Sequence, residues 1–283
     1  STSTFSSGTS WGGPGHGASP CRHETNGTGL KQTISCIMIV KDEEANIKAC
    51  LDALAWADEI IVVDSNSSDR TADICKANPK VKLFERHWKG FGPQKNIALS
   101  LATSNWVFSI DADERVSPEL ASEIINSVEN PSFDAYAVKR KNIYRGRWVR
   151  NCGWWPDEVL RLFRRGAAKF SDRVVHEALE FKGPAGTLEN PLEHHSYNGA
   201  GDFIRRVERY SSLGAHQMSS RRKRASTTNI LGRTALAFIR SYILKKGFLE
   251  GRAGLLIAFS TAEVTFYKYM LLSEINEEKE KKS

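Results

Sequence analysis

The chain has 283 residues, of which 40% are hydrophobic and 26% are charged, as in soluble globular proteins. This length and composition exclude collagen-like, disordered and disulfide-scaffold proteins, and allow one large domain or one domain with an appendage. The formal net charge is +7, but residues 34–133 contain 10 basic and 16 acidic side chains, whereas residues 134–283 contain 28 basic and 16 acidic ones. An acidic front half therefore precedes a basic back half.

The N-terminal segment is dominated by small residues, because Gly, Ser, Thr and Pro occupy 21 of the positions 1–33. Such a segment buries too little apolar surface to offset its ordering entropy, so residues 1–33 are predicted to be a disordered leader. It lacks the basic region and apolar stretch of a signal peptide. The five cysteines contain no C-x-x-C pair, which favours reduced thiols. We therefore expect a cytosolic chain.

From residue 34 onwards, apolar runs of strand length alternate with segments of helical periodicity. Strands are predicted at 34–40, 59–64, 81–87 and 106–111, and helices are predicted to begin near Asp42, at Ser67 or Ser68, near Pro93 and at Ser117. Further short strands are predicted at 135–144, 159–163 and 178–181. Strands separated by helices indicate an α/β fold with a mainly parallel, twisted sheet flanked by helices.

The segment from about residue 201 is predicted to be a helical, basic C-terminal extension. Residues 253–272 have the length of a membrane span, but they contain Glu263 and Lys268. A charge near the centre of a bilayer costs a few kcal/mol on insertion scales, which argues against a true span.

In a sheet of this kind, ligands bind at the carboxyl ends of the strands. No glycine lies between residues 41 and 46, and no G-x-x-x-x-G-K-[ST] motif occurs, which argues against a Rossmann dinucleotide site and excludes a P-loop. The second strand ends at Asp64, before a cluster of Ser, Asp and Thr. Asp64 could accept hydrogen bonds from a nucleotide, or the cluster could form a turn and a helix cap.

The fourth strand ends in Asp111-Ala112-Asp113-Glu114. Asp111 and Asp113 project to the same side of an extended backbone and repel each other unless a cation is present. Mg²⁺ and Mn²⁺ prefer such oxygen ligands and pair them with substrate phosphates. The alternative is an acidic loop that caps the next helix. The apolar strand before the acids favours a metal and diphosphate site.

These motifs resemble those of family 2 glycosyltransferases, which have the GT-A fold. The resemblance is carried by I-V-K-D-E-E-A-N-I, I-I-V-V-D-S-x-S-x-D-x-T, G-P-Q-K-N-I-A and D-A-D-E, and covers about residues 34–272. The later W-W-P-D-E-V-L-R-L-F-R-R, V-V-H-E and G-F-L-E-G-R-A-G-L resemble a subgroup acting on the lipopolysaccharide inner core, typified by β-1,4-glucosyltransferases. The expected organisation is a catalytic domain at 34–200, with a nucleotide-sugar half at 34–133 and an acceptor half at 134–200. A membrane-associating region at 201–283 would follow.

The resemblance implies a role for individual residues. Asp64 would contact the nucleotide base or ribose, and Asp42 and Glu43, where the family usually has Asn-Glu, would contact the base. Lys95 would neutralise a phosphate or a carboxylate at the binding edge. Asp111 and Asp113 match the metal-binding pair of the family, with Asp111 also beside the nucleotide.

The expected reaction is an inverting sugar transfer from a UDP-sugar, with glucose as the expected sugar. A divalent metal would stabilise the departing diphosphate, and a carboxylate would take the proton of the acceptor hydroxyl. We predict Asp157 as this base, because it follows two tryptophans and a proline. The structural alternative is that Asp157 caps a helix or forms a salt bridge near Arg161, and Glu177 is the alternative base. The resemblance favours His176 as a metal or diphosphate ligand.

The roles predicted for other basic residues are less specific. His194 and His195 are weaker ligand candidates than His176, and the arginines at 161, 164 and 165 could bind a phosphate or lie on a solvated strand edge. The expected acceptor is a glycolipid, namely the heptose of the lipopolysaccharide inner core. The alternatives are a polyprenyl-linked sugar, a peptide, or a non-catalytic sugar-nucleotide-binding protein.

The basic C-terminal extension has three interpretations. It could bind nucleic acid, form a solvated surface, or lie in the interface of an anionic membrane. Residues 221–224 are one short basic cluster without a nucleic-acid-binding module, so no nucleic acid is expected. Since a lipid-linked acceptor requires a place at the membrane, we predict a peripheral protein on the cytoplasmic face of the inner membrane.

Overall fold

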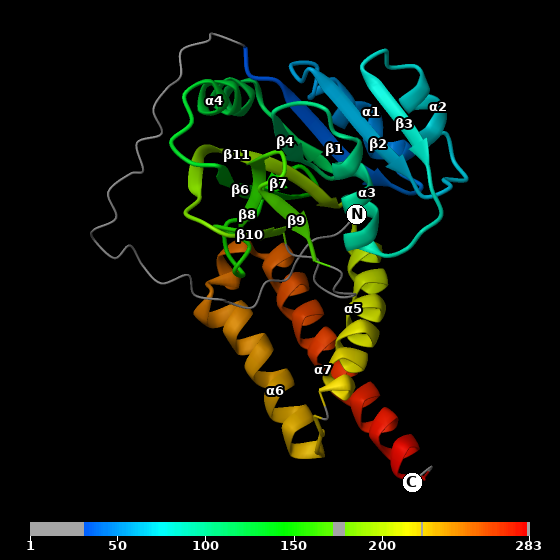
Figure 1. The fold of residues 1–283 in the computed structure, drawn as a ribbon. Coiled ribbons are helices and arrows are strands. Elements are labelled where there is room, and N and C mark those ends of the chain that lie inside the picture. The colour runs from blue at the N-terminus through cyan, green and yellow to red at the C-terminus, as the bar shows by residue number, and fades with distance from the viewer. Residues whose placement is uncertain (1–30, 172–178, 222, 282–283) are drawn as a thin grey trace. The chain divides into compact units, whose positions relative to one another are not determined.

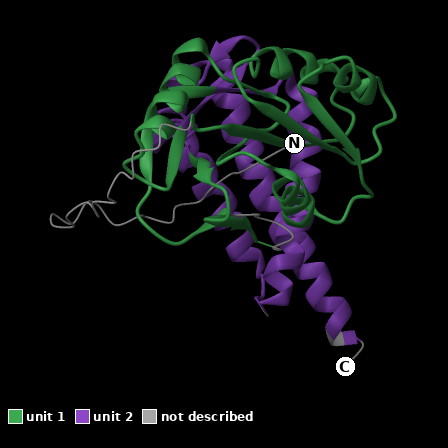
Figure 2. Ribbon diagram, turned by 45° about the horizontal axis from the view of Figure 1, so that its top comes forward, with its two compact units in different colours: residues 1–138, 159–192 green, residues 139–158, 193–283 purple. Residues whose placement is uncertain are grey.

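The computed structural model describes residues 31–171, 179–221 and 223–281. Contacts within the chain divide it into two compact units, each built from two segments (Figure 2). Unit 1 comprises the chain up to Val138 together with Val159–Leu192, and unit 2 comprises Lys139–Glu158 together with Glu193–Ser283. Most of the predicted leader, residues 1–30, lies outside the described residues.

In unit 1, strands and helices alternate as the sequence predicts. The elements are β1 (Ile34–Val40), α1 (Glu44–Asp52), β2 (Glu59–Asp64), α2 (Thr71–Lys76), β3 (Val81–Glu85), α3 (Phe91–Leu101), β4 (Trp106–Ser109), β5 (Glu114–Arg115) and α4 (Pro118–Glu129). They are followed by β6 (Ala135–Tyr144), β8 (Glu158–Arg164), β9 (Ala168–Phe170), β10 (Leu179–Phe181) and β11 (Gly186–Tyr197). β6 and β11 begin in unit 1 and end in unit 2.

The main sheet is parallel in its first half, as predicted. β1 pairs in parallel with β2 on one side and with β4 on the other, and β2 pairs in parallel with β3 (Figure 1). β4 pairs with β8 in the antiparallel sense, and the strand order is β3-β2-β1-β4-β8-β6-β11-β5. β1 and β2 are buried along their whole length, because helices cover both faces of a parallel sheet. The α/β prediction is confirmed.

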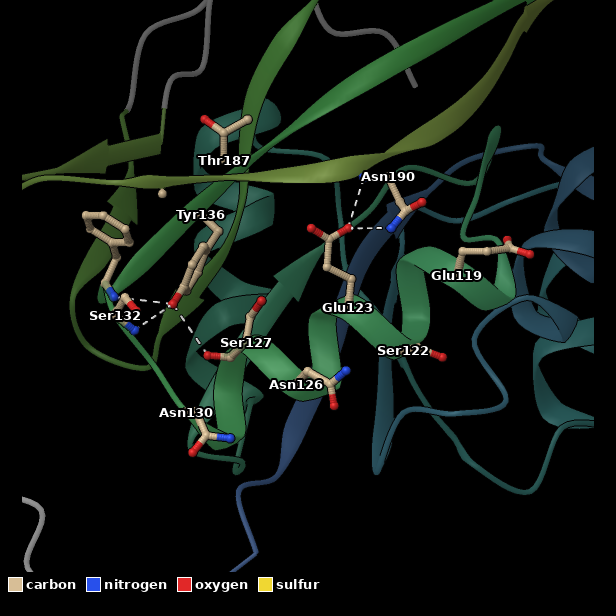
Figure 3. A pocket seen from close by; sticks show the side chains of 12 residues that line it. Glu119, Ser122, Glu123, Asn126, Ser127, Asn130, Ser132, Tyr136, Thr187 and Asn190 are labelled. Atoms are coloured by element: carbon tan, nitrogen blue, oxygen red, sulfur yellow. Dashed lines mark hydrogen bonds between the residues drawn. The ribbon is translucent and has the colours of Figure 1, made fainter. Parts of the chain in front are cut away.

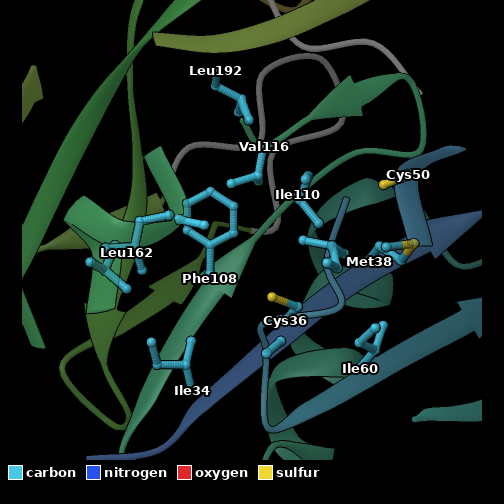
Figure 4. Packing of buried hydrophobic residues seen from close by; sticks show 14 of the residues in the cluster. Ile34, Cys36, Met38, Cys50, Ile60, Phe108, Ile110, Val116, Leu162 and Leu192 are labelled. Atoms are coloured by element: carbon cyan, nitrogen blue, oxygen red, sulfur yellow. The ribbon is translucent and has the colours of Figure 1, made fainter. Parts of the chain in front are cut away.

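The core of unit 1 lies on both faces of this sheet. Alternate residues of a strand point to opposite faces, so Cys36 and Met38 of β1 pack with α1 and α4 on one face (Figure 4). Ile37 and Ile39 pack with α3 on the other face. The two core layers hold the helices against the sheet and leave the loops after β1, β2 and β4 at one edge.

Of the helix starts predicted from capping residues, that of α4 is confirmed, and those of α1 and α2 are wrong. Ser117 caps α4 as predicted, because its hydroxyl accepts a hydrogen bond from the Leu120 backbone N–H at 3.2 Å. Asp42 does not cap α1: its backbone has φ 52, and its carboxylate accepts from Ser68 instead. The second helix begins at Thr71 rather than at Ser67 or Ser68, because Ser67 is held in a turn by Asp64.

Unit 2 contains the end of β6, β7 (Arg147–Trp148), the end of β11 and the C-terminal helices. The helices are α5 (Ala200–Ser220), α6 (Thr227–Ile239), a π-helical turn η1 (Arg240–Leu244), a 3₁₀ turn η2 (Gly247–Glu250) and α7 (Arg252–Lys281). α7 packs against both α5 and α6. The predicted helical extension is therefore present.

One helix among the described residues is long and apolar enough to cross a membrane, judged by length and composition. It is Arg252–Lys279, with a mean hydropathy of 1.3 in its most apolar window, of which 28% is buried. Core helices of soluble proteins meet the same criteria, but they are mostly buried, whereas most of this window is not.

Candidate active site

The predicted donor-site residues lie at the carboxyl ends of three parallel strands in unit 1. The register pairs Val40 with Asp64 and Ile37 with Ser109, so the loops after β1, β2 and β4 leave the same edge of the sheet. The chain proceeds from β1 outwards to β2 and β3 and then returns to β4 on the other side of β1. This reversal is the topological switch point at which open α/β sheets bind ligands.

A buried network of two acids and two bases follows β4. The Asp111 carboxylate lies 3.2 Å from Lys95 Nζ of α3 and 2.8 Å from Arg161 Nη2 of β8. Arg161 Nη2 also lies 2.5 Å from Glu114 Oε1, and Glu114 Oε2 accepts from the Asp111 backbone N–H at 2.9 Å. None of the four residues is more than 5% exposed. Among these four side chains, two positive charges balance two negative ones.

The charged neighbours of Asp111 and Arg161 outweigh the effect of burial on the pKa values of these two residues. Burial alone would raise the pKa of Asp111, but Lys95 and Arg161 outweigh it and hold that pKa well below its usual value. Burial alone would lower the pKa of Arg161, but Glu114 and Asp111 raise it. Both groups are therefore charged at neutral pH. The structure places Lys95 beside a carboxylate, which is one of its two predicted partners.

Asp113 lies on the turn that joins β4 to β5, two residues after Asp111, and is 5% exposed. Arg115 fixes this turn, because its guanidinium donates to the carbonyl oxygens of Ala112, Glu114 and Asn46 at 2.7–2.9 Å. Asp113 therefore places a second carboxylate of this turn in a fixed position, close in sequence to Asp111.

A divalent metal fits this arrangement through few protein ligands. Asp111 contacts Lys95 and Arg161, and Asp113, two residues further on, is the second carboxylate of the turn that could contact a cation. Mg²⁺ commonly uses one or two carboxylates and completes its shell with water and substrate phosphates. Within the described ranges, no group of three or more His, Cys, Asp and Glu side chains is arranged to hold a metal by itself. His176, the other predicted ligand, and Glu177 lie outside the described residues.

The acids after β1 and β2 tie two loops together. The Asp64 carboxylate accepts from the backbone N–H and the hydroxyl of Ser67, and Asp42 accepts from the backbone N–H and the hydroxyl of Ser68. Glu43 accepts from the side-chain amide of Asn46. A carboxylate has about four acceptor positions, so the bonds of Asp42 and Asp64 leave capacity for a ligand. The nucleotide contacts of Asp42, Glu43 and Asp64 stay predictions.

Two contacts at this edge were not predicted from the sequence. Glu44 accepts from Arg70 Nε and Nη2 at 3.0 and 2.9 Å, which ties α1 to the loop before α2. The Gln94 side chain, fully buried in α3, donates to Ser65 Oγ at 3.1 Å. α3 therefore contacts the loop after β2 through Gln94 and the turn after β4 through Lys95. Neither partner is adjacent in sequence, so no local signal identifies these pairs.

In unit 2, the predicted base Asp157 is paired with an arginine of β6. Asp157 Oδ2 accepts from Arg140 Nε at 2.9 Å and from Arg140 Nη2 at 2.5 Å. The Arg140 backbone N–H donates to the Asp157 carbonyl at 2.8 Å. Asp157 is therefore in a salt bridge, as the structural alternative expects, but its partner is Arg140, because Arg161 belongs to the network of unit 1. Asp157 is partly accessible, since 17% of its side chain is exposed.

The residues around Asp157 have different environments. Trp154 is buried in a stack with Tyr197 and Phe203, which is a core position, whereas Trp155 is half-buried. His194 is buried, and its Nδ1 lies 2.7 Å from Asn142 Oδ1. It therefore supports the strand rather than facing solvent. His195 is half-exposed, 3.4 Å from Glu193.

Unit 1 also contains a polar pocket of about 630 Å³ between α4 and the start of β11. In Figure 3, Glu123 points to Asn190, and Tyr136 points to Ser132 and Ser127. Glu123 accepts from Asn190 at 2.8–2.9 Å, through its backbone N–H and its amide. The Tyr136 hydroxyl accepts from the Ser132 backbone N–H at 3.0 Å. These polar groups bind one another and tie α4 to β11.

Comparison with known proteins agrees with this fold. The family model described as "Glycosyl transferase family 2" matches residues 35–182. The lipopolysaccharide core biosynthesis glycosyltransferase LpsC of Rhizobium meliloti is 28% identical over 264 residues, which are 87% of this chain and 96% of LpsC. An uncharacterized glycosyltransferase of Rickettsia typhi is 27% identical over 256 residues, 86% of this chain and 87% of the relative.

A solved structure has the same fold. The mannosyltransferase PcManGT from Pyrobaculum calidifontis, in complex with GDP-Man and Mn²⁺, superposes with a TM-score of 0.51 at 16% identity, over 88% of each chain. The family match covers more than half of the chain, including all the strand-end motifs of unit 1. The chain therefore belongs to glycosyl transferase family 2.

Proposed function

We propose that the chain transfers a sugar from a UDP-sugar to a glycolipid at the cytoplasmic face of the inner membrane, with inversion at the anomeric carbon. The observation that carries this proposal is the fixed turn after β4 at the switch point. There, Asp113 lies two residues from Asp111, which contacts Lys95 and Arg161. A divalent cation that accompanies a nucleoside diphosphate is complementary in charge to a carboxylate at this place.

The proposed roles follow from these positions. Residues 34–133 bind the donor, with Asp64, Asp42 and Glu43 facing the nucleoside and Asp113 holding the metal, joined by His176. A bound Mg²⁺ or Mn²⁺ supplies Lewis-acid stabilisation of the leaving diphosphate. Lys95 and Arg161 keep Asp111 charged and fixed, so that the turn keeps its shape as charge develops.

The acceptor half, residues 134–200, is proposed to supply the base. Asp157 accepts the proton of the acceptor hydroxyl while the hydroxyl oxygen forms its bond to the anomeric carbon. The bond between that carbon and the diphosphate oxygen breaks, and UDP leaves with the electron pair. The bidentate contact from Arg140 holds the Asp157 carboxylate in one orientation for this step.

The metal role is tested with Asp113→Asn, and the matched control is Asp73→Asn, which changes an exposed carboxylate of α2. We expect Asp113→Asn to lower UDP release in the presence of acceptor by about 100-fold or more, with an unchanged circular dichroism spectrum. Asp73→Asn should be at wild-type level. Wild-type turnover in Asp113→Asn would overturn the metal assignment.

The base is tested separately with Asp157→Asn, and the control is Asp134→Asn, which changes an exposed, arginine-paired carboxylate of unit 1. We expect UDP-sugar binding, measured by calorimetry, to persist while transfer falls by about 10²–10⁴-fold. Transfer near the wild-type rate in the asparagine variant would move the assignment to another carboxylate, with Glu177 as the next candidate.

The acceptor assignment is supported by the similarity to LpsC, which is named as a glycosyltransferase of lipopolysaccharide core biosynthesis. It is tested by incubating the chain with a panel of UDP-sugars and truncated core glycolipids, and by detecting the added mass. We expect a hexose, with glucose the best donor, on a core heptose. Transfer to a polyprenyl-linked sugar or a peptide instead would replace the acceptor, and binding without transfer to any of them would favour a non-catalytic protein.

The membrane assignment is supported by an exposed apolar face on the C-terminal helices. The large hydrophobic residues of this face are between 42% and 68% exposed: Leu231, Leu236, Ile239, Ile243, Leu244, Phe248 and Leu249. Arg233, Arg240, Lys246 and Arg252 on the same helices are also exposed. Apolar residues flanked by cations match the interface of an anionic bilayer.

Liposome co-sedimentation tests this face. The triple variant Leu236→Gln, Ile243→Gln, Leu244→Gln should lose most of its binding to vesicles that contain phosphatidylglycerol. Ile204→Gln, on the equally exposed Ile204 of α5, should keep it. Arg240→Gln with Arg252→Gln should weaken binding by roughly 10- to 30-fold, since each cation contributes about 1 kcal/mol. Equal binding of the wild type to neutral and anionic vesicles would contradict the proposal.

A further inference from the structure

A second cluster of chemical interest lies in unit 2, beside Asp157. The rings of Trp148 and Trp155 meet edge to face, with centroids 5.1 Å apart. The guanidinium carbon of Arg150 lies 4.1 Å from the centroid of the Trp148 ring, and Lys141 Nζ lies 5.6 Å from the same ring. One aromatic side chain therefore holds two cations.

The backbone keeps this cluster in a fixed relation to Asp157. Strand β6 pairs with β7 through Ile143 and Trp148, and the Val149 backbone N–H donates to the Asn142 carbonyl. The Asn142 side chain donates to the Trp154 carbonyl at 3.0 Å. Since Arg140 of the same strand binds Asp157, three residues of β6, namely Arg140, Asn142 and Ile143, hold both ends of the segment 148–157.

The charge of this region is strongly positive. Residues 139–150 contain six Lys and Arg side chains and no Asp or Glu. Three of the six have acidic partners in unit 2: Arg140 pairs with Asp157, Lys141 with Glu193 at 2.7 Å, and Arg147 with Glu250 at 3.6 Å.

Arg150 differs from these three. It is exposed, and among the residues that the structure describes no carboxylate lies within salt-bridge distance of its guanidinium. Its contact is with the face of the Trp148 ring. A guanidinium stacked on an indole keeps its N–H fork at the edge, where it can bind a carboxylate or a phosphate through two parallel hydrogen bonds. The tryptophan orients the arginine and thereby lowers the entropy that binding would otherwise cost.

We propose that Trp148, Arg150 and Lys141 form an acceptor subsite that binds an anionic group of the sugar acceptor. This inference rests on the proposed function. The anion is a phosphate or a carboxylate carried by the acceptor, and the Arg150 fork binds it. Lys141, which is paired with Glu193, contacts the same Trp148 ring and helps to hold it in place. Trp148 is a positioning residue for Arg150. The acceptor hydroxyl that reacts at Asp157 would then belong to a sugar anchored through its anionic substituent.

The experiment compares acceptors that differ only in the anion: a phosphorylated core glycolipid, its phosphatase-treated form, and a form with its carboxylates reduced to alcohols. The readout is the acceptor KM for each. We expect Arg150→Gln to raise KM about 10- to 100-fold for the acceptor with the recognised anion, the equivalent of one charge-assisted hydrogen-bond pair. The ratio of KM between anionic and neutral acceptors should collapse towards one. The treated form that loses affinity in the wild type identifies phosphate or carboxylate as the source.

Two further variants separate charge from orientation. Arg150→Lys keeps the charge but loses the fork, so it should recover only part of the effect. Trp148→Leu should raise KM in the same acceptor-dependent way as Arg150→Gln, with kcat less affected. The matched control is Arg145→Gln, which removes an exposed cation of the same basic stretch and should leave both KM values unchanged.

The same KM increase for anionic and neutral acceptors, or no increase, would overturn the subsite. Binding of a sugar phosphate and of a sugar acid to the intact chain, measured by calorimetry, tests it without turnover: Arg150→Gln should lose the binding that the wild type and Arg145→Gln keep. If the wild type transfers no sugar to any glycolipid, the proposed function fails, and this binding experiment still decides the subsite.

Discussion

The two units depart from ordinary burial in opposite ways. Unit 1 buries four charged side chains at the switch point of its sheet, whereas unit 2 leaves seven large apolar side chains of α6, η1 and η2 exposed. Charged residues are rarely buried, and contiguous apolar surface is rarely left in water. Each departure marks the place of a proposed interaction: a nucleotide sugar in unit 1 and a bilayer at unit 2. The contrast predicts that the same kind of substitution has different consequences in the two units.

The largest effect is expected from breaking the buried network. Arg161→Met removes the cation that contacts both Asp111 and Glu114 and leaves these two acids buried, so unfolding free energy should fall by about 3–5 kcal/mol. Arg164→Met, three residues along β8, breaks a pair with Asp134 in which both side chains are about half exposed, and should change it by less than about 1 kcal/mol. Urea unfolding followed by circular dichroism measures both. Equal midpoints for the two variants would show that the network contributes little to stability.

A somewhat smaller effect is expected at acid pH from Glu59 of β2. Burial alone would raise its pKa, but Lys82, Ser35 and Thr103 lower that pKa from 4.5 to about 2. Because the folded pKa lies below the unfolded one, the stabilisation is complete above about pH 4.5. It is lost as pH falls towards 2, and amounts to roughly 3 kcal/mol.

Glu59→Gln isolates this contribution from other acids, Asp111 included. The stability difference between wild type and variant should be largest above pH 4.5 and should shrink between pH 4.5 and 2. The measurement is urea unfolding across this pH range. A difference that is independent of pH would contradict the ion-pair origin of the shift.

A smaller loss of stability is expected from removing a helix cap, and each unit offers one cap for comparison. Ser117→Ala removes the cap of α4, whose hydrogen bond is 3.2 Å, and should lower stability by about 1 kcal/mol. Ser226→Ala removes the cap of α6, whose bond of 3.4 Å is exposed, and should cost less. Thermal unfolding of both variants ranks them, and a larger loss at Ser226 would reverse the expected order.

The smallest effect on stability is expected at the exposed apolar face. Leu236→Gln and Ile243→Gln should each change the free energy of unfolding by no more than about 0.5 kcal/mol, since both side chains are already in water in the folded chain. Chemical denaturation without lipid measures this. A loss of 2 kcal/mol or more would mean that these residues are packed in solution and that the face has another occupant.

Local patterns predicted most of the fold and less of the site. The continuous apolar runs of β1 and β2 and the Ser-Pro start of α4 are signals contained in a few neighbouring residues, and the structure confirms them. The partner of Arg161 is not such a signal. Asp157 is four residues away in sequence and Asp111 is fifty, but the antiparallel pairing of β4 with β8 brings Arg161 to Asp111.

Asp42 illustrates the same limit on a smaller scale. An acid before a helical pattern is a good capping residue, and nothing in its neighbourhood indicates that Ser68, in the next loop, is its partner. The bonds that join the loops after β1 and β2 depend on the parallel register of the strands that precede them. The pairing of the strands therefore has to be known before the role of an individual acidic residue can be predicted.

The two units interleave along the chain, which passes between them after residues 138, 158 and 192. The Cys152 backbone N–H donates to the Lys245 carbonyl, and the backbone N–H groups of Arg150 and Asn151 donate to the Glu250 carboxylate. During synthesis, residues 139–158 therefore leave the ribosome well before these partners. Unit 1 can close once residue 192 has emerged, whereas unit 2 must wait for the C-terminal helices. Exchange of unit 2 between relatives therefore requires two grafts, 139–158 and 193–283, since a single cut would separate a carboxylate at position 250 from the backbone it holds.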